Sequence, residues 1–544
     1  MDVRFEGNST MNRATAAPLP ASYGALNLDN ICSFIRARRV AIAGSISFLV
    51  VTIIYLRTMM PGPAFMDTGE FQTVTYVLGV AHPTGYPLYT IVGKIFGTII
   101  PIGSWAYRMN LLSVLSVAAA ASLLTWLALR YRVSPLVAVI GALGFAFSLN
   151  TWRAGGHADP YTLTVMIGAA LWVMAIKWAD TGQRRWLWSI AFLSGIGLGS
   201  AGVLSMELPA IILFVVIAQP RKFLWPPTMI VAGLLGIIGL VGIYLYLPIR
   251  GSMHPPLNYG NTYTWAGFQF VALGGQVGGI INYLTWEGLR VFLRNLPQVV
   301  GWYSEWLSPA GLALVTLLGL IGLGALLIRD WRLAICATLG IVIPVYPTLT
   351  MPINDTTHYV LISNWLIFFL AAIGIEVLIV RPLRNLEYGS FRQALSPVVF
   401  GLLLWLPFGL ARMNWAAADM HDYHDAELLA RAVFAHVKPH SVIFCWWGPS
   451  NALWYAHYVE GLGPDVEIYD DSTTLDRGWG GVTPAIGHFY PERPVYSLPA
   501  GDQIEVIGKK YKLRMISDIG VFGQTMYEVV GRTGTPPAQT PNQR

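Results

Sequence analysis

Charged side chains are scarce in this sequence. Asp, Glu, Lys and Arg together make up 12% of its 544 residues, whereas hydrophobic residues make up 54%. Soluble domains carry about 25% charged residues, so this chain has too little charge and too much apolar surface for a water-soluble fold. We therefore expect a lipid bilayer to serve as the solvent for most of the chain.

Cysteine is rarer still. Cys32, Cys336 and Cys445 lie far apart along the chain, and this spacing excludes a disulfide framework or a cysteine-based zinc site. We interpret all three as small buried hydrophobic residues. The formal net charge of +6 does not indicate nucleic-acid binding, because the Lys and Arg residues lie in short clusters between apolar runs, which is typical of membrane topology signals.

Long apolar runs dominate what the sequence does contain. A helix that crosses a bilayer needs about 20 mostly apolar residues, and about eleven runs meet this requirement. The run at 72–100 is also apolar, but Pro83, Gly85 and Pro87 interrupt it, so we predict a loop with interfacial helices there. The predicted spans are 40–59, 109–129, 135–150, 161–178, 186–201, 204–219, 227–247, 310–328, 332–349, 359–379 and 394–411.

The segments between these runs alternate in charge. Lys and Arg accumulate on the cytoplasmic side of membrane proteins, so we predict that the basic set is cytoplasmic, together with the polar N-terminal tail 1–37. The other set, with the long loops 60–108 and 248–309 and everything after 412, is then predicted to be non-cytoplasmic. The basic set comprises 36–39, 130–132, 181–185, 220–222, 329–332 and 381–392.

The segment 413–544 changes character, with more charge and short strand-like runs. A strand at 441–447, a helix at 449–461 and a strand at 465–471 indicate a small α/β domain. Further strands are predicted at 493–499 and 526–531. The predicted fold is thus an all-α polytopic membrane domain over 38–412, followed by a small extracytoplasmic α/β domain.

The most informative segment, FMDTGEFQTVTYVLGVAHPTGYPLY at 65–89, follows the first predicted span. Asp67 and Glu70 are three residues apart, which places both carboxylates on one face of a helix. The pattern is also typical of a helix start with Asp67 as N-cap and Glu70 as its capping-box partner. His82 and Tyr86 lie in a Pro- and Gly-containing loop that we expect to be rigid; an interfacial turn with Tyr86 as a belt aromatic is the alternative.

This segment resembles a family signature, D-x-G-E-F followed by H-P-x-G-Y-P-L. The signature marks a bacterial family of membrane proteins that is similar to eukaryotic protein O-mannosyltransferases and belongs to the GT-C glycosyltransferase superfamily. Weaker similarities continue over most of residues 50–380. They are TWRAGGHADPYTL at 151–163, YLYLPIR at 244–250 and INDTTHYV at 353–360.

The resemblance implies a GT-C-like fold and transfer of a hexose, with mannose as one candidate, from a polyprenyl-phosphate donor. The acceptor would be a hydroxyl of a protein, lipid or glycan on the non-cytoplasmic face, and the anomeric carbon would be inverted. Membrane lipids are expected partners and nucleic acid is not. Two carboxylates three residues apart can hold Mg²⁺ or Mn²⁺, but no metal-specific pattern is present, so no cofactor is assigned.

The resemblance also suggests roles for individual residues. Asp67 is the expected base for the acceptor hydroxyl, and Glu70 is expected to orient the acceptor or to position Asp67. Arg250 is the expected contact for the donor phosphate, because the charge rule disfavours Arg at the outer end of a span; an Arg that reaches lipid headgroups is the alternative. Arg153 and His82 are further candidates for this contact.

Three more residues complete the predicted substrate-binding set. Tyr86 belongs to the first-loop motif, while Asp159 and Asp355 match acidic positions of the family in the segments 151–163 and 353–360. For both acids, an ordinary outer-loop carboxylate is the alternative.

The sequence also departs from the family pattern. Asn261 stands where the family has a carboxylate, and the region of Glu207, an acid inside a predicted span, lacks the family's histidine. These departures leave open a catalytically silent structural subunit of a membrane complex. A lipid or solute transporter is the other alternative, but apart from Glu207 the predicted spans contain almost no charge, which argues against it.

Overall fold

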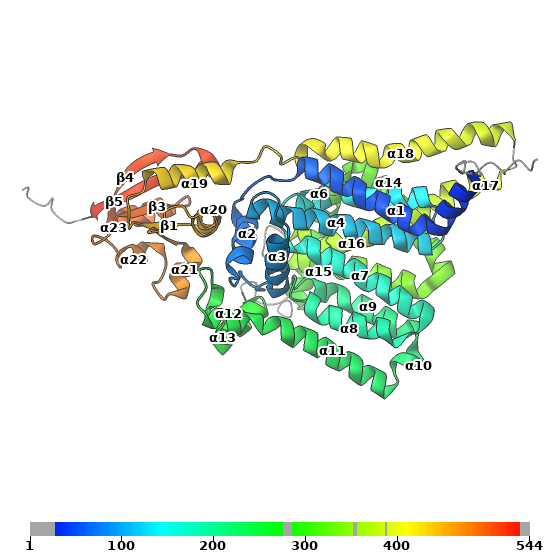
Figure 1. Cartoon of the computed structure of the whole chain (residues 1–544), viewed down its shortest axis with the longest axis horizontal. Helices are drawn as coiled ribbons and strands as arrows, with labels where there is room; N and C mark the ends of the chain where they lie inside the picture. The colour runs from blue at the N-terminus through cyan, green and yellow to red at the C-terminus, as the bar shows by residue number, and fades with distance from the viewer. Residues whose placement is uncertain (1–27, 276–284, 352–355, 387–388, 534–544) are drawn as a thin grey trace, which may run out of the picture.

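The computed structural model describes residues 28–275, 285–351, 356–386 and 389–533. A helical body lies at one end and a small lobe with a β-sheet at the other (Figure 1). Within the described residues, seven helices are long and apolar enough to cross a membrane. They are Arg38–Thr58, Trp105–Arg130, Pro160–Thr181, Pro226–Ser252, Trp286–Thr350, Thr357–Asn385 and Gln393–Ala418.

Several helices of the body begin at a proline, among them those that start at Pro135, Pro160 and Pro226. Proline suits the first helical turn because its fixed φ is compatible with the helix and no N–H partner is needed there. The helices of the body are α1 (Leu28–Thr58), α4 (Trp105–Arg130), α5 (Pro135–Phe147), α6 (Leu149–Gly155), α7 (Pro160–Thr181), α8 (Arg184–Gly197), α9 (Leu204–Ala218), α10 (Pro220–Phe223), α11 (Pro226–Tyr244), α12 (Tyr246–Ser252), α14 (Trp286–Val342), α15 (Val345–Thr350), α16 (Leu361–Ile375), α17 (Arg381–Asn385) and α18 (Ser390–Ala418).

The predicted number of about eleven spans is not confirmed. The predicted spans 186–201 and 204–219 form α8 and α9, whose 14 and 15 residues fall short of a full crossing. The predicted span 135–150 bends by 70° between α5 and α6 and counts as an eighth span only if this pair is taken as one. The predicted spans 310–328 and 332–349 fall within one apolar helical stretch, Trp286–Thr350. Its main helix, α14, has non-helical backbone at Ser308 and Asp330.

The first loop folds into two helices, α2 (Met66–Val77) and α3 (Pro87–Ile99), at the end of the body that faces the lobe (Figure 1). The predicted capping box is wrong. The N-cap of α2 is Phe65, without a side-chain cap, and Asp67 lies inside the first turn. An acid in that turn still interacts favourably with the positive end of the helix dipole.

The long loop 248–309 lies against the first loop. Val80 pairs with Asn258 in an isolated parallel bridge, with hydrogen bonds from the Val80 N–H to the Leu257 carbonyl (2.9 Å) and from the Tyr259 N–H to the Val80 carbonyl (3.2 Å). This backbone pairing fixes the turn that leads to His82. The described part of the long loop also contains η1 (Tyr259–Asn261) and α13 (Trp265–Ala272).

The lobe contains a five-stranded sheet in the order β2-β1-β3-β5-β4. Strands β2, β1 and β3 are parallel to one another, and β5 pairs in antiparallel fashion with both β3 and β4. The predicted strand–helix–strand start is present, whereas β4 was not predicted. The elements are α19 (Asp425–His436), β1 (Val442–Cys445), α20 (Trp447–Tyr458), β2 (Glu467–Tyr469), α21 (Asp471–Asp476), α22 (Val482–Ile486), β3 (Val495–Leu498), α23 (Gln503–Lys510), β4 (Tyr511–Asp518) and β5 (Thr525–Arg532).

Helix α20 joins the lobe to the body by packing on α2. One hydrophobic core runs without a break from Phe71 of the first loop to Leu453 and Tyr455 of α20. The Tyr455 hydroxyl accepts a hydrogen bond from the Ala106 backbone N–H at 2.9 Å. Helix α20 is therefore fixed against the first loop and the start of α4.

Candidate active site

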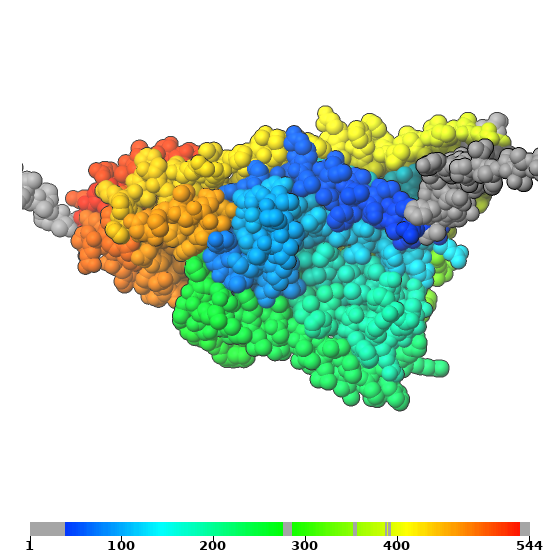
Figure 2. Space-filling model, in the orientation of Figure 1, coloured from blue at the N-terminus to red at the C-terminus, as the bar shows by residue number. Residues whose placement is uncertain are grey.

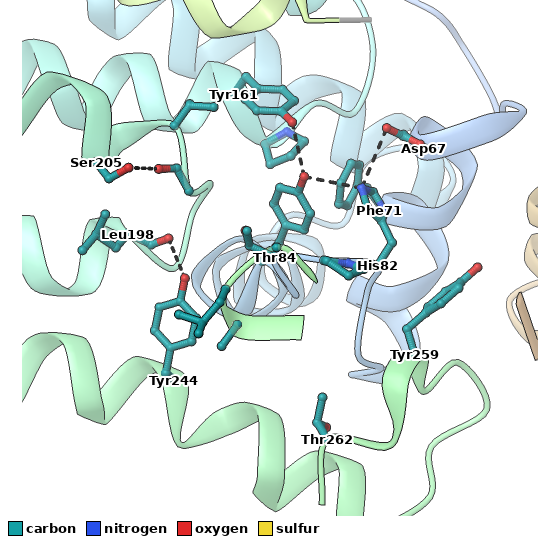
Figure 3. Close-up of a pocket in the computed structure, with 18 of the residues that line it drawn as sticks. Asp67, Phe71, His82, Thr84, Tyr161, Leu198, Ser205, Tyr244, Tyr259 and Thr262 are labelled. Atoms are coloured by element: carbon teal, nitrogen blue, oxygen red, sulfur yellow. Dashed lines mark hydrogen bonds and ion pairs between the residues drawn. The ribbon is translucent and has the colours of Figure 1, made fainter. Parts of the chain in front are cut away.

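A cavity of about 1630 Å³ opens between the first loop, the long loop and the lobe. Space-filling atoms of the three regions, in blue, green and orange, adjoin one another on the face shown in Figure 2. One part of the wall is polar and comes from the first loop and the start of α7 (Figure 3). Another part is apolar and comes from the helices α9 and α11 and their neighbours, including Leu198, Met206, Leu240, Val241 and Leu245.

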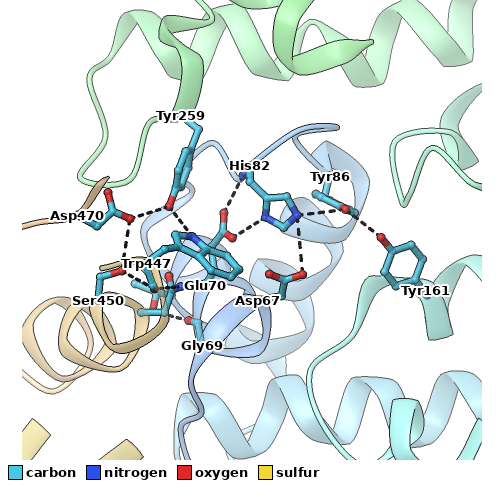
Figure 4. Close-up of polar contacts among 12 residues, drawn as sticks. Asp67, Gly69, Glu70, His82, Tyr86, Tyr161, Tyr259, Trp447, Ser450 and Asp470 are labelled. Atoms are coloured by element: carbon cyan, nitrogen blue, oxygen red, sulfur yellow. Dashed lines mark hydrogen bonds and ion pairs between the residues drawn. The ribbon is translucent and has the colours of Figure 1, made fainter. Parts of the chain in front are cut away.

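Glu70 makes two contacts with His82 (Figure 4). Glu70 Oε2 lies 2.6 Å from His82 Nδ1, and Glu70 Oε1 accepts a hydrogen bond from the His82 backbone N–H at 2.7 Å. The Glu70 side chain is completely buried. Since an unpaired buried carboxylate is very unfavourable, the position of His82 and the burial of Glu70 depend on each other.

The environment of His82 favours its protonated form. Burial alone lowers the pKa of this imidazole, but the charges of Glu70 and Asp67 and the hydrogen bond to Glu70 raise it by more, to about 9. The ring is therefore positively charged near neutral pH. Its edge meets the ring of Trp447 at a centroid distance of 6.1 Å.

Asp67 is the accessible acid of the site. Its Oδ2 lies 4.0 Å from His82 Nε2, its side chain is 52% exposed, and it lines the cavity. Its carboxylate is therefore open to molecules that enter the cavity. Asp67 is thus able to accept a proton from a molecule in the cavity, whereas the buried Glu70 acts on His82.

A second polar cluster lies at the start of α7. Asp159 is the N-cap of this helix and accepts a hydrogen bond from the Tyr161 N–H at 2.7 Å. Its other oxygen lies 2.9 Å from His358 Nδ1, and the His358 ring stacks on Tyr161 at 5.4 Å. The hydroxyl of Tyr86 lies 3.4 Å from His82 Nε2 and 3.2 Å from the Tyr161 hydroxyl, and so links the two clusters.

The lobe supplies one wall of the site (Figure 4). Trp447 donates its Nε1–H to the Tyr259 hydroxyl at 3.0 Å, and this hydroxyl lies 3.4 Å from Asp470 Oδ2. Burial raises the pKa of Asp470 to about 6, although hydrogen bonds from Thr473 oppose this shift. Trp447 and Tyr259 were not predicted from the sequence, since the first-loop motif gives no signal for residues so distant in the chain.

The structure brings together some of the predicted site residues. Asp67, His82, Tyr86 and Asp159 all line the cavity, and Glu70 lies directly behind His82. His157 and His358 also line the cavity but were not predicted, although both lie within segments that carry the family resemblance.

Other predicted residues lie elsewhere. Arg250 donates to the Leu78 and Val77 carbonyls at the end of α2, at 2.8 and 3.2 Å. Arg153 donates to the Ala417 carbonyl and pairs with Glu305 at 3.3 Å. Neither arginine is among the residues that line the cavity. Asp355 falls outside the described residues.

The two departures from the family pattern also lie away from the cavity wall. Asn261 donates to the Asp476 carbonyl at 3.2 Å and joins the long loop to the lobe. Glu207 is buried in α9 and accepts a hydrogen bond from Trp172 Nε1 at 2.7 Å.

Asp67, Glu70 and His82 are also the one group of possible metal ligands found among the described residues. One ligand atom from each lies within 4.8 Å of the others. Two oxygens and one nitrogen suit a divalent cation such as Mn²⁺ or Mg²⁺. The Glu70–His82 contact of 2.6 Å is a hydrogen-bond distance, so a metal ion would have to replace this bond.

Comparison with known proteins places this geometry in context. Residues 67–224 match the model of a family described as the protein O-mannosyl-transferase TMEM260 N-terminal domain. Protein O-mannosyl-transferase TMEM260 of Mus musculus is 26% identical over 460 residues, which cover 79% of this chain and 63% of that protein. Its namesake in Dictyostelium discoideum is 28% identical over 295 residues, 49% of this chain and 35% of that protein. The matches thus span less than two thirds of either relative.

Solved structures share the fold. ArnT from Cupriavidus metallidurans bound to undecaprenyl phosphate superposes with a TM-score of 0.59 over 91% of this chain and 98% of that chain, at 11% identity. Its apo form gives a TM-score of 0.58. The chain is therefore an integral membrane protein with an ArnT-like GT-C fold, similar in sequence to protein O-mannosyl-transferases.

Proposed function

We propose that the protein is a membrane glycosyltransferase that transfers a hexose, with mannose as the leading candidate, from a polyprenyl-phosphate donor to an acceptor hydroxyl. The observation that carries the proposal is the half-exposed Asp67, whose Oδ2 lies 4.0 Å from His82 Nε2, in a cavity with one polar and one apolar wall. Such a cavity suits an amphiphilic donor, whose sugar phosphate needs polar contacts and whose isoprenoid chain needs apolar ones. The names of the relatives support the same activity.

The proposed reaction is a single displacement with inversion. The acceptor oxygen attacks the anomeric carbon while Asp67 takes the hydroxyl proton. The bond between the anomeric carbon and the phosphate oxygen breaks, and polyprenyl phosphate leaves with the bonding electron pair. Phosphate is a good leaving group, so no strong acid is required, but its negative charge needs a partner.

We further propose that the site faces the non-cytoplasmic side and that 413–544 forms an extracytoplasmic domain. The alternating charge of the connecting segments supports this orientation. For the acceptor, we propose only that it carries a hydroxyl group; it is a protein, a lipid or a glycan.

The first test is sugar transfer by purified protein from radiolabelled polyprenyl-phosphate mannose, compared with an Asp67→Asn variant. Loss of a general base costs about 10²–10⁴-fold in rate, so we expect transfer to fall by at least about 10²-fold. Asp502→Asn, at an exposed position in the lobe, is the matched control and should retain full activity. Equal transfer by wild type and Asp67→Asn would remove Asp67 from the reaction.

Removal of divalent cations distinguishes two roles for Asp67, a general base and a metal ligand. With Asp67 as base, transfer persists in excess EDTA. If EDTA abolishes transfer and added Mn²⁺ or Mg²⁺ restores it, the Asp67, Glu70 and His82 group holds a metal. If neither wild type nor variants transfer any of several hexoses, the silent structural subunit becomes the better reading.

A further inference from the structure

The start of α2 carries Asp67 but gains little stability from its own sequence. Phe65 is the N-cap and offers no side-chain cap to the free N–H groups of the first turn. Met66, the first residue of the helix, has a φ of 57°, a left-handed conformation that residues other than glycine rarely adopt. Such a backbone persists only where the surrounding structure holds it. Tertiary contacts therefore have to fix the helix start from which Asp67 extends.

The membrane body supplies one of these contacts. The Ala64 N–H donates to Gln72 Oε1 at 3.1 Å, and Gln72 Nε2 donates to Asn110 Oδ1 of α4 at 3.0 Å. The backbone just before Phe65 is thus tied to the body. The Phe65 side chain takes no part in these bonds, yet it is buried, so another part of the chain covers it.

The lobe covers Phe65 with an aromatic stack. The turn between β4 and β5 contains η6 (Val521–Gly523). In this turn, the ring of Phe522 stacks on Phe65 with a centroid distance of 4.3 Å and an interplanar angle of 16°. Phe522 also stacks on Trp446, at 5.7 Å and 11°. Stacked aromatic rings share a large apolar area, so the positions of the three rings depend on one another.

The turn that carries Phe522 is itself held in place. Trp446 Nε1 donates to Gln524 Oε1 at 3.2 Å, and Gln524 Nε2 donates to the Phe522 carbonyl at 3.1 Å. The Ile519 N–H donates to the Gln524 carbonyl at 3.1 Å and closes the turn. Gln524 is buried, and hydrogen bonds shielded from water are stronger than exposed ones. Phe522 is therefore presented to Phe65 from a fixed support.

Both ends of the stack adjoin the candidate active site. Phe65 lies two residues before Asp67. Trp446 is followed by Trp447, which lines the cavity and donates to the Tyr259 hydroxyl. A general base acts only from a productive position, and a misplacement of about 1 Å can cost about 10²-fold in rate. The stack thus links the position of the proposed base to the lobe.

Resting on the proposed function, we infer that Phe522 is a positioning residue, which fixes the start of α2, and with it Asp67, by stacking on Phe65. Phe522 is not among the residues that line the cavity, so it acts on the reaction through Phe65. The lobe then has two roles: it forms one wall of the cavity and it holds the base in place.

The first experiment measures sugar transfer by Phe522→Leu and Phe522→Tyr over a range of donor concentrations. Leucine removes the ring, whereas tyrosine keeps it, and the 41% exposure of Phe522 leaves room for the added hydroxyl. We expect Phe522→Leu to lower kcat by about tenfold or more, with the KM for the donor unchanged, and Phe522→Tyr to retain the wild-type kcat. Met515→Ala, at an exposed position of β4, is the control and should behave like wild type.

The same substitution in an Asp67→Asn background separates positioning from a general loss of structure. If Phe522 acts through Asp67, Phe522→Leu does not lower the residual transfer of Asp67→Asn any further, because no base is left to misplace. Phe65→Leu should give the same pattern from the other side of the stack. A loss by the same factor in both backgrounds would overturn the inference, and so would a wild-type kcat in Phe522→Leu.

A second readout does not depend on sugar transfer. A spin label on Met66→Cys, with Cys32 replaced by Ser, reports the mobility of the α2 start by electron paramagnetic resonance. We expect Phe522→Leu to make this label more mobile and to leave a label on Asp502→Cys, in the lobe, unchanged.

The two readouts distinguish failure of this inference from failure of the proposed function. A Met66 label with the same mobility in both proteins would overturn the inference even where wild type transfers sugar. If wild type transfers no hexose but the label responds to Phe522→Leu, the proposed function fails, whereas the hold of Phe522 on α2 is supported.

Discussion

Glu70 and Asp67 are two carboxylates of one motif with different surroundings, and the difference separates their roles. Glu70 is buried and makes two contacts with His82, whereas Asp67 is half exposed at the cavity. The charge of His82 depends mainly on Glu70, which opposes the effect of burial. Removal of the Glu70 charge should therefore change the pH dependence of activity.

We predict that Glu70→Gln shifts the alkaline limb of the pH–rate profile to lower pH. In the wild type, the pKa of His82 is raised to about 9 from an ordinary value of 6.5. A raised pKa means that the Glu70–His82 interaction is fully present below about pH 6.5 and is lost as pH rises through about 9. Without the Glu70 charge, burial dominates and His82 loses its proton at lower pH. The profile of kcat/KM measures this shift.

Asp502→Asn, far from His82, is the control for this profile and should retain the wild-type alkaline limb. An unchanged limb in Glu70→Gln would show that His82 does not control activity at high pH.

Local sequence predicted part of the site, namely Asp67, Glu70, His82 and Tyr86. These residues are close in the chain, and the turn between α2 and α3 brings them together. His358 and Trp447 were not predicted, because their proximity to the first loop depends on the packing of α7, the long loop and the lobe. For Arg250, the sequence was misleading. Its position at the outer end of a predicted span suggested that it binds the donor phosphate, but in the structure it donates to the backbone carbonyls of α2.

At the scale of elements, the contact between α2 and α20 depends on Gly69. A Cβ at this position would lie 2.2 Å from the Ala64 carbonyl oxygen and 3.1 Å from Asn451 Cβ. No side chain fits there unless the backbone moves. Gly69 therefore lies at a close contact between the first loop and Asn451 of the lobe.

We predict that Gly69→Ala destabilises the protein by about 1–3 kcal/mol, the usual result of overpacking, and also lowers activity because α2 carries Asp67. Thermal unfolding in detergent and sugar transfer measure the two effects. Gly242→Ala is the matched control, since a Cβ there meets no atom within 4 Å. Gly69→Ala with wild-type stability would mean that α2 and α20 pack less tightly than described.

Apolar runs predicted the helices better than they predicted the spans. Length and hydropathy locate α4 and α7 correctly, but they cannot show that α5 bends into α6 or that α8 and α9 end early. In the lobe, β4 was missed because its residues alternate only weakly between buried and exposed positions. Its place at the sheet edge, paired only with β5 within the described sheet, explains that weak pattern.

At the scale of the whole molecule, the orientation in the membrane is open to a direct test. After replacement of Cys32 by Ser, we predict that Asp502→Cys, in the lobe, reacts with a membrane-impermeant maleimide in intact cells. Gln183→Cys, equally exposed in a basic segment, should react only after the cells are permeabilised. The opposite pattern would place the cavity on the cytoplasmic side. Cys336 and Cys445 are buried and should not interfere.

The wall that Trp447 and its neighbours Asp471 and Ser472 contribute to the cavity has a consequence for biosynthesis. During translation, the ribosome delivers Asp67 to the membrane before it delivers the lobe. Until translation has passed these residues, the nascent membrane body contains Asp67, the proposed base, but lacks one side of the cavity. Formation of the full cavity therefore requires translation to pass α20, and premature termination before α20 would leave an inserted but incomplete site.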